Sequence, residues 1–176
     1  LDFFRSTYLS SDDSRDRTVM AASFRDDGRK RRALGGDFIC AHWRRRDFVR
    51  AHGKELPSIE GTAKQLNELL EKTGVSKIFL ATDAPQSEFM LLSKLLAAPV
   101  FRFSDPKLHD GAVAIIDQWI CAHARLFIGS HLSTFSYRIQ EDREILGFPV
   151  NATFNRLCPD GVLQCEQPSK WTIVYE

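Results

Sequence analysis

The sequence predicts one α/β domain, a Rossmann-like parallel sheet with flanking helices. Short, continuous apolar runs recur along the 176-residue chain, and segments with helical spacing of apolar residues lie between them. Such runs are typical of strands buried on both faces, as in parallel sheets. Strands that alternate with helices form doubly wound folds, in which ligands bind outside the carboxyl ends of the strands. We therefore expect a binding site at that edge.

The individual elements follow from local patterns. The run Phe38–Ala41 predicts the first strand, and a helix begins after Pro57 with Ser58 as its N-cap and ends at Gly74. The later strands are expected at Lys77–Ala81, Val100–Phe103 and Arg125–Gly129, and the later helices at Ser87–Leu96, Gly111–Ala124 and Phe135–Leu146. From Asn151 onward the chain is expected to be irregular.

The N-terminal part of the chain has a different, more polar composition. Ser11–Arg32 is rich in Asp, Arg, Lys and Ser, and its few apolar residues cannot bury enough surface to fold alone. We interpret residues 1–35 as linker and surface loop and residues 36–176 as the domain. Because the chain opens with Leu1 and an amphipathic stretch, we expect a further domain to precede it.

The amino-acid composition limits the classes of partner that we expect. With 24 basic and 23 acidic side chains the formal net charge is +1, so no net field attracts nucleic acid or anionic lipid. The basic cluster at residues 29–32 is offset by Asp26 and Asp27 and is interpreted as a solvated loop. No apolar run reaches the roughly 20 residues of a membrane span. We predict no nucleic-acid partner and no membrane span.

The motif HWRRRDF follows the first strand, at the edge where a ligand is expected. If the extended conformation continues, His42, Arg44 and Arg46 face one way and Trp43 and Arg45 the other. A planar guanidinium binds phosphate in a bidentate manner and would neutralise a departing diphosphate. We predict that Arg44 is catalytic and that Arg45 and Arg46 form ordinary salt bridges.

A hydroxyl-rich turn, GSHLSTFS, follows the fourth strand and leads into a helix. A helix N-terminus presents free N–H groups and partial positive charge, which suits a phosphate. Ser133 and Thr134 could add hydroxyl donors, although both could equally be helix caps. The turn lacks the glycine spacing of dinucleotide-binding and P-loop proteins, so neither class is favoured.

Two further acids and a histidine stand near these motifs. Asp117 lies in a largely apolar helix and needs a partner, either a ribose or base edge or an arginine, and the sequence does not decide between them. Asp83 ends the second strand and is interpreted as structural. His123 is expected to pack in the interior.

The cysteines and one sequon point to the secretory pathway. Cys40 and Cys121 sit in apolar segments and are interpreted as small buried hydrophobes. Cys158 and Cys165 flank a polar turn and could close it by a disulfide, with zinc as a rival that no CxxC pair supports. Asn151 begins an N-glycosylation sequon, Asn-Ala-Thr.

Read together, HWRRRDF, FLATDA, AIIDQWICAHARLFIG, STFSYRI, EDREILG and the CEQP at Cys165 resemble the type-2 protein O-fucosyltransferases. The resemblance runs from about Gly36 to the end and implies the C-terminal, donor-binding domain of a GT-B glycosyltransferase. It implies inverting transfer of fucose from GDP-fucose to Ser or Thr hydroxyls of folded thrombospondin type 1 repeats in the endoplasmic reticulum lumen, with no cofactor and no metal.

Position by position, the family's donor site falls on His42, Arg44, Asp117, Ser133, Thr134 and Phe135. Trp43 and His131 depart from the family pattern, and His131 is expected to alter donor contacts slightly. The family's catalytic base, a glutamate of the first domain, has no counterpart here, so we expect it outside this chain, in the N-terminal half of the same enzyme.

Two alternatives remain open at this point. One is a related GDP-fucose-dependent transferase with a different acceptor, since these residues would recognise mainly the donor. The other is a non-catalytic nucleotide-binding module, which would apply if this chain acts alone.

Overall fold

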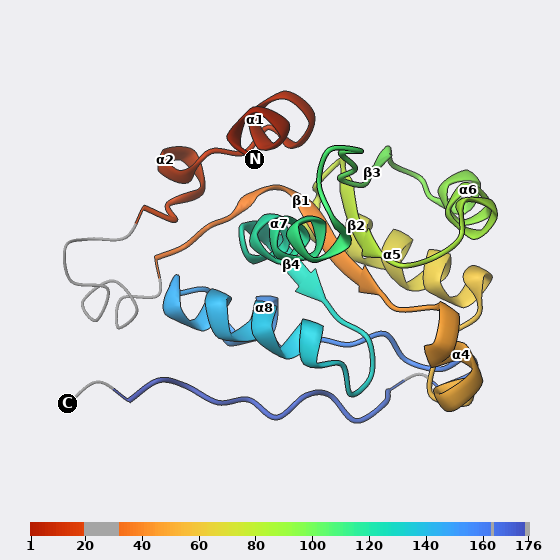
Figure 1. Cartoon of the computed structure of the whole chain (residues 1–176). Helices are drawn as coiled ribbons and strands as arrows, with labels where there is room; N and C mark the ends of the chain where they lie inside the picture. The colour runs from red at the N-terminus through yellow and green to blue at the C-terminus, as the bar shows by residue number, and fades with distance from the viewer. Residues whose placement is uncertain (20–31, 163, 175–176) are drawn as a thin grey trace.

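The computed structural model describes residues 1–19, 32–162 and 164–174 and has a four-stranded parallel sheet with helices on both faces (Figure 1). The strand order is β3-β2-β1-β4, and every pair of neighbours is parallel. The strands are β1 (Gly36–Trp43), β2 (Ile78–Thr82), β3 (Val100–Phe101) and β4 (Ala124–Ile128). The predicted fold class is confirmed.

Eight helical segments accompany these strands within the described residues. They are α1 (Asp2–Leu9), α2 (Asp13–Asp16), α4 (Arg46–His52), α5 (Ile59–Thr73), α6 (Gln86–Leu95), α7 (Asp110–Ala122), α8 (Thr134–Ile145) and the 3₁₀ turn η1 (Val150–Ala152). The expected start and end of α5 are confirmed: Ser58 Oγ accepts the Gly61 N–H at 2.9 Å, and Gly74 ends the helix with a φ of 69°. The short helix α4 was not predicted.

Alternation along the strands divides the core into two layers. Ile39, Ala41 and Trp43 of β1 face α5 and α6, whereas Phe38 and Cys40 face the opposite side, where α7 and α8 pack. Figure 1 shows these helix pairs on the two faces of the sheet. Successive residues at the end of β1 are therefore delivered to different sides of the molecule.

Residues 1–18 differ from the sequence prediction. Instead of a surface loop, α1 and α2 bury the Arg5 side chain, whose guanidinium lies 2.7 Å from Asp13 and 3.2 Å from Asp16. Leu9 packs with Phe38 in the layer beneath α7. Charged residues here form a buried network, which composition alone does not reveal. Most of the predicted loop, residues 20–31, lies outside the described residues, as do residues 29–31 of the basic cluster.

The interpretation of Cys40 and Cys121 only as small buried hydrophobes missed a bond between them. Both side chains are fully buried, but they form a disulfide between β1 and α7, with a Cα–Cα distance of 5.1 Å. The two residues are 81 positions apart. Their pairing depends on how α7 crosses the sheet, and that crossing is not visible in local sequence.

Candidate functional site

The end of β1 and the start of α8 meet at the carboxyl edge of the sheet. Ser130, in the turn after β4, accepts the Arg44 N–H at 2.9 Å and donates to the His42 carbonyl at 2.8 Å. Ser136, in the first turn of α8, accepts the Ser130 N–H at 3.1 Å and lies 2.8 Å from Nδ1 of His42. Three of these hydrogen bonds join two segments that are about 90 residues apart in the chain, and the bond between Ser130 and Ser136 braces the second segment.

Close packing holds this junction. A Cβ on Gly129 would lie 2.6 Å from Ser136 Oγ, so only glycine allows the turn to approach the helix. In the same turn Leu132 adopts a φ of 44°. Ser130 and Ser136 were not singled out from the sequence. The signal that could have identified them is their position in a hydroxyl-rich turn at a parallel strand end.

Arg44 lies between two acids at this edge. Its guanidinium is 3.0 Å from Asp83 and 2.8 Å from Asp47, and the side chain is 36% exposed. Asp83 also accepts the Arg45 N–H at 2.6 Å. The structural interpretation of Asp83 is supported by these contacts, which fix where the chain leaves β1 and leave the Arg44 guanidinium at the surface.

The extended conformation does not continue as far as Arg46, so the expected alternation of side chains stops before it. Strand β1 ends at Trp43, and Arg46 begins α4 with a φ of 29°. Arg45 turns toward the α5 and α6 side, where it pairs with Glu88 at 2.7 Å and stacks over the Trp43 ring at 4.9 Å. The predicted salt bridge of Arg45 is therefore present. Among the described residues, Arg44 is the one of the three arginines whose backbone N–H binds the turn before α8.

His42 is a buried, neutral ring. Its side chain is 4% exposed and stacks on Phe135 with ring centroids 4.3 Å apart. Burial, with a smaller contribution from the Arg44 charge, lowers the pKa of His42 to about 3. The imidazole therefore stays uncharged at physiological pH.

The start of α8 leaves its first turn open. Ser133 is the N-cap, but its side chain accepts no backbone N–H of the helix. Ser133 is buried and Thr134 is exposed. The alternative of a side-chain cap is therefore not observed, and the first-turn N–H groups remain available for an anion.

Asp117 occupies the middle of α7. Because α7 links β3 to β4, it runs antiparallel to the strands, and Asp117 lies one turn nearer the carboxyl edge than Cys121. Its carboxyl group is 9% exposed, and Oδ1 has no hydrogen-bond partner within the described residues. Burial raises the pKa of Asp117 to about 8, opposed by the positive charge of Arg102. A protonated carboxyl group can both donate and accept hydrogen bonds.

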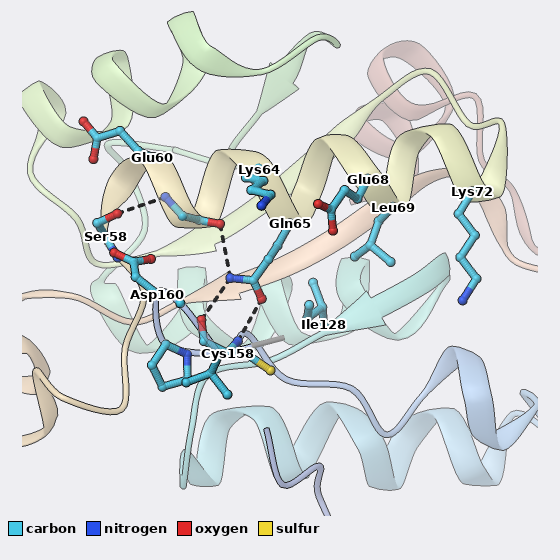
Figure 2. A pocket seen from close by; sticks show the side chains of 14 residues that line it. Ser58, Glu60, Lys64, Gln65, Glu68, Leu69, Lys72, Ile128, Cys158 and Asp160 are labelled. Carbon is cyan, nitrogen blue, oxygen red and sulfur yellow. Dashed lines mark hydrogen bonds between the residues drawn. The ribbon is translucent and has the colours of Figure 1, made fainter. Parts of the chain in front are cut away.

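A second concavity lies away from these residues. A cavity of about 650 Å³ opens between α5 and the turn at residues 158–162, lined by side chains that include Lys64, Glu68, Leu69 and Ile128 (Figure 2). None of the predicted donor-site residues lines it. The site at the strand ends is an open edge, with Arg44 at its surface and His42 beneath.

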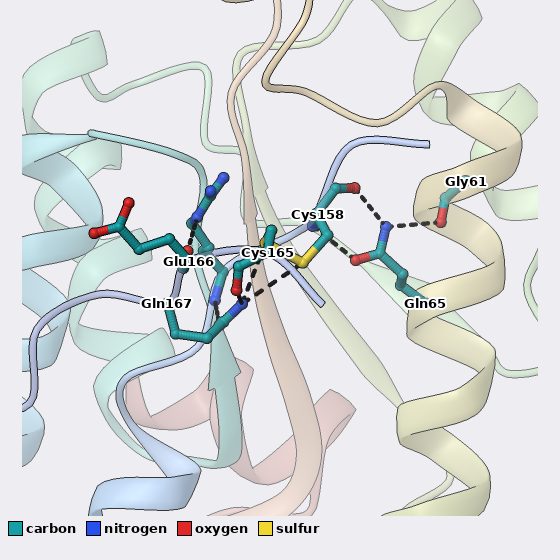
Figure 3. Close-up of a disulfide and its surroundings, with 7 residues drawn as sticks. Gly61, Gln65, Cys158, Cys165, Glu166 and Gln167 are labelled. Atoms are coloured by element: carbon teal, nitrogen blue, oxygen red, sulfur yellow. Dashed lines mark hydrogen bonds between the residues drawn. A yellow bond between two sulfur atoms is a disulfide. The ribbon is translucent and has the colours of Figure 1, made fainter. Parts of the chain in front are cut away.

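Cys158 and Cys165 form the disulfide that was considered from the sequence (Figure 3). The bridge lies near α5, where Gln65 binds both the N–H and the C=O of Cys158, at 2.8 and 2.9 Å. Asn151 is exposed, as glycan attachment requires. His123 packs in the interior as expected, 1% exposed and bonded to the Trp119 carbonyl.

Two searches of the described residues were negative. No group of three or more His, Cys, Asp or Glu side chains is arranged to hold a metal ion. None of the helices in the described ranges combines the length and apolar content needed to cross a bilayer.

The model of the family described as GDP-fucose protein O-fucosyltransferase matches residues 14–146, which include both halves of the site. The chain belongs to the GDP-fucose protein O-fucosyltransferase family. Among curated members, "GDP-fucose protein O-fucosyltransferase 2" of Caenorhabditis elegans is 55% identical and the Homo sapiens protein of the same name is 46% identical, each over 99% of this chain. The Drosophila melanogaster protein of that name is 40% identical over 98% of it.

The chain spans only part of these O-fucosyltransferases, 42% of the Caenorhabditis and human proteins and 36% of the Drosophila protein. Among solved structures, POFUT1 in complex with GDP is similar, with a TM-score of 0.51 at 19% identity over 79% of this chain and 48% of that one. A second, POFUT1 in complex with GDP-fucose, also has a TM-score of 0.51. These structures establish the shared fold.

Proposed function

We propose that this chain supplies the GDP-fucose-binding half of a peptide O-fucosyltransferase. The observation that carries the proposal is the hydrogen-bonded junction in which Ser130 and Ser136 hold His42 and Arg44 beside the start of α8. The Arg44 backbone is thereby held beside the free N–H groups at the helix start. Helix N–H groups and a guanidinium are both donors that suit a diphosphate. Family membership selects GDP-fucose as the donor.

Each predicted donor residue has a role in this proposal. Arg44 neutralises the negative charge that develops on the diphosphate as its bond to the fucose anomeric carbon breaks. Ser133, Thr134 and Phe135 form the helix start that seats the phosphates, and Phe135 also supports His42. Asp117, whose buried Oδ1 has no hydrogen-bond partner within the described residues and whose raised pKa keeps it protonated, binds a ribose or base edge.

The remaining features of the reaction are inferred from the family. We infer that the acceptor is a Ser or Thr hydroxyl of a folded thrombospondin type 1 repeat, that transfer proceeds with inversion, and that it needs no metal or cofactor. The base that removes the acceptor proton belongs to the N-terminal half of the enzyme, since no glutamate here lies in a motif suited to it. The two disulfides and the exposed Asn151 sequon support folding in an oxidising compartment, and we place it in the endoplasmic reticulum lumen.

Replacing Arg44 tests the proposal. In the full-length enzyme, Arg44→Ala is expected to lower kcat for fucose transfer to a thrombospondin repeat on the order of a hundred- to a thousandfold, because the guanidinium acts on charge that develops in the transition state. GDP affinity, measured by calorimetry, should fall by a smaller factor.

Arg138→Ala is the matched control. Arg138 is 53% exposed and pairs with Glu141 and Asp142 on the outer side of α8, so its removal changes the net charge equally without touching the junction. Near-normal kcat in Arg44→Ala, or an equal loss in both variants, would remove Arg44 from the mechanism. Absence of GDP-fucose binding by the wild-type enzyme would refute the proposed function itself.

A different acceptor is a second candidate, because none of the relatives named here has a name that specifies a thrombospondin repeat. The Arabidopsis thaliana protein "O-fucosyltransferase 36" is 29% identical over 65% of this chain. A panel of folded thrombospondin repeats, other folded repeats and free glycans, each assayed with GDP-fucose, distinguishes the two candidates by which acceptor gains fucose.

A further inference from the structure

We infer that Ser136 is a positioning residue that fixes His42 as the tautomer with its proton on Nε2, so that Nε2–H is the donor offered to the nucleoside diphosphate. The inference rests on the proposed function for its ligand, but its tautomer part rests on geometry alone. Ser136 itself touches no ligand in this arrangement and acts through the imidazole.

The protons at the junction can be assigned one at a time. Ser136 Oγ accepts the Ser130 N–H, which occupies one of its two lone pairs. Its other contact is Nδ1 of His42, at 2.8 Å. Within the described residues no further acceptor lies in hydrogen-bonding range of the Ser136 hydroxyl, which is 1% exposed. The hydroxyl proton therefore goes to Nδ1.

The opposite assignment leaves a buried group unsatisfied. If Nδ1 carried the proton and donated to Ser136, the serine hydroxyl hydrogen would have no acceptor in a site closed to water. With Ser136 as donor, Nδ1 is the acceptor and the single imidazole proton resides on Nε2. The low pKa of His42, about 3, excludes the doubly protonated ring at neutral pH.

Among the described residues, the other contacts of the imidazole do not involve Nε2. The Phe135 ring covers one face of the imidazole, and the described residues provide no hydrogen bond to Nε2. Nδ1 is directed at Ser136 in α8, and the Arg44 charge is near enough to contribute to the lowered pKa of His42. An uncharged N–H donor beside a guanidinium adds a hydrogen bond to a diphosphate without adding charge.

Nitrogen NMR of the full-length enzyme, labelled with ¹⁵N-histidine, tests the tautomer at pH 7 without ligand. His42→Ala assigns the His42 resonances by their loss. The wild-type spectrum is expected to show a protonated Nε2 and an unprotonated Nδ1, and Ser136→Ala is expected to produce a mixture of tautomers. A wild-type ring protonated on Nδ1, or an unchanged tautomer in Ser136→Ala, would overturn the inference.

A double-mutant cycle tests whether Ser136 acts through His42. Ser136→Ala is expected to weaken GDP binding roughly three- to tenfold in the wild-type background and to have no further effect in His42→Ala, because the interaction it supports is already gone. Equal effects in both backgrounds would show that Ser136 is merely structural. Ser93→Ala is the matched control, since its hydroxyl bonds only the Phe89 carbonyl within α6, and it should leave GDP affinity unchanged.

The two readouts separate the inference from the proposed function. The tautomer is measured without any nucleotide, so the NMR result tests the tautomer assignment whether or not GDP binds. If wild-type enzyme shows the protonated Nε2 but does not bind GDP, the assignment of a diphosphate to Nε2–H is overturned together with the proposed function.

Discussion

Two titratable side chains of the site, His42 and Asp117, are uncharged at neutral pH for the same reason. Both are buried, and burial disfavours the charged form, which lowers the pKa of the histidine to about 3 and raises that of the aspartate to about 8. The Asp117 carboxyl group is therefore protonated in the folded state at neutral pH. Its ionisation is thereby coupled to stability.

Asp117→Asn is expected to be more stable than wild type above neutral pH. Since the folded-state pKa of Asp117 exceeds its unfolded value of 3.8, the folded state holds a proton that the unfolded state has lost between about pH 4 and 8, and wild-type stability falls as pH rises through that window. The advantage of Asn should grow by up to about 1.4 kcal/mol per pH unit and level off above about pH 8.

Urea unfolding of the ligand-free, full-length enzyme from pH 5 to 9 measures this difference. Asp47→Asn provides the control, because the Asp47 side chain is 73% exposed and should show no such growth. A difference between Asp117→Asn and wild type that is independent of pH would contradict the assignment of a neutral carboxyl group.

Whether a site residue could be recognised from the sequence depended on how far along the chain its partners lie. His42, Arg44 and the hydroxyl-rich turn are marked by their positions at strand ends, and the structure brings them together. Ser136 and Ser130 look like ordinary serines until their partners, about 90 residues away, are in place. The burial of Asp117 likewise follows from the packing of α7, which no local pattern specifies.

At the scale of elements, the turn closed by Cys158 and Cys165 caps a distant helix. The Asp160 carboxylate accepts the Ser58 N–H at 3.2 and 3.1 Å, at the start of α5, while Gln65 holds the Cys158 backbone. An acid at a helix N-terminus is stabilising, and here it comes from another part of the chain. The disulfide closes the turn that carries Asp160, which Figure 2 shows beside Ser58.

Replacing both cysteines with serine is expected to lower the free energy of unfolding by about 2–3 kcal/mol. Asp160→Asn should cost about 0.5–1 kcal/mol with the disulfide present and close to nothing without it, because the opened turn no longer holds the carboxylate beside α5. Denaturant unfolding of the four proteins gives the coupling. Additive losses would show that the bridge and the cap are independent.

The order of strands and helices was predictable because each buried strand and each amphipathic helix carries its own periodicity. Helix α4 escaped prediction since its arginine-rich start resembles a continuing strand, and the chain turns there because Asp83 binds the Arg45 N–H. The helices at residues 2–9 and 13–16 were missed for another reason. Arg5, Asp13 and Asp16 satisfy one another's charges in the interior, so a polar composition does not mark a solvated loop.

At the scale of the whole molecule, Arg143 ties three elements together. Its guanidinium donates to the carbonyls of Ala122 at the end of α7, Ala124 in β4 and Ala152 in η1, at 3.0, 2.8 and 3.0 Å. The side chain is fully buried and lies over the Phe148 ring, and burial lowers the pKa of Arg143 to about 9. The carbonyls at these junctions therefore depend on one residue.

Arg143→Leu is expected to lower the free energy of unfolding by about 3–5 kcal/mol, because several buried carbonyl groups lose their donor. Thermal and denaturant unfolding of the full-length enzyme measure the loss. Arg50→Leu, at an exposed arginine of α4, should change stability by less than about 0.5 kcal/mol. Similar small effects for both variants would show that the buried guanidinium is dispensable.

The bond between Cys40 and Cys121 has a consequence for the spacing of two residues of the proposed donor site. His42 lies two residues beyond one sulfur on β1, and Asp117 lies one helical turn before the other on α7. A covalent bond thus ties the strand that carries His42 to the helix that carries Asp117, and it limits how far these two side chains can move apart.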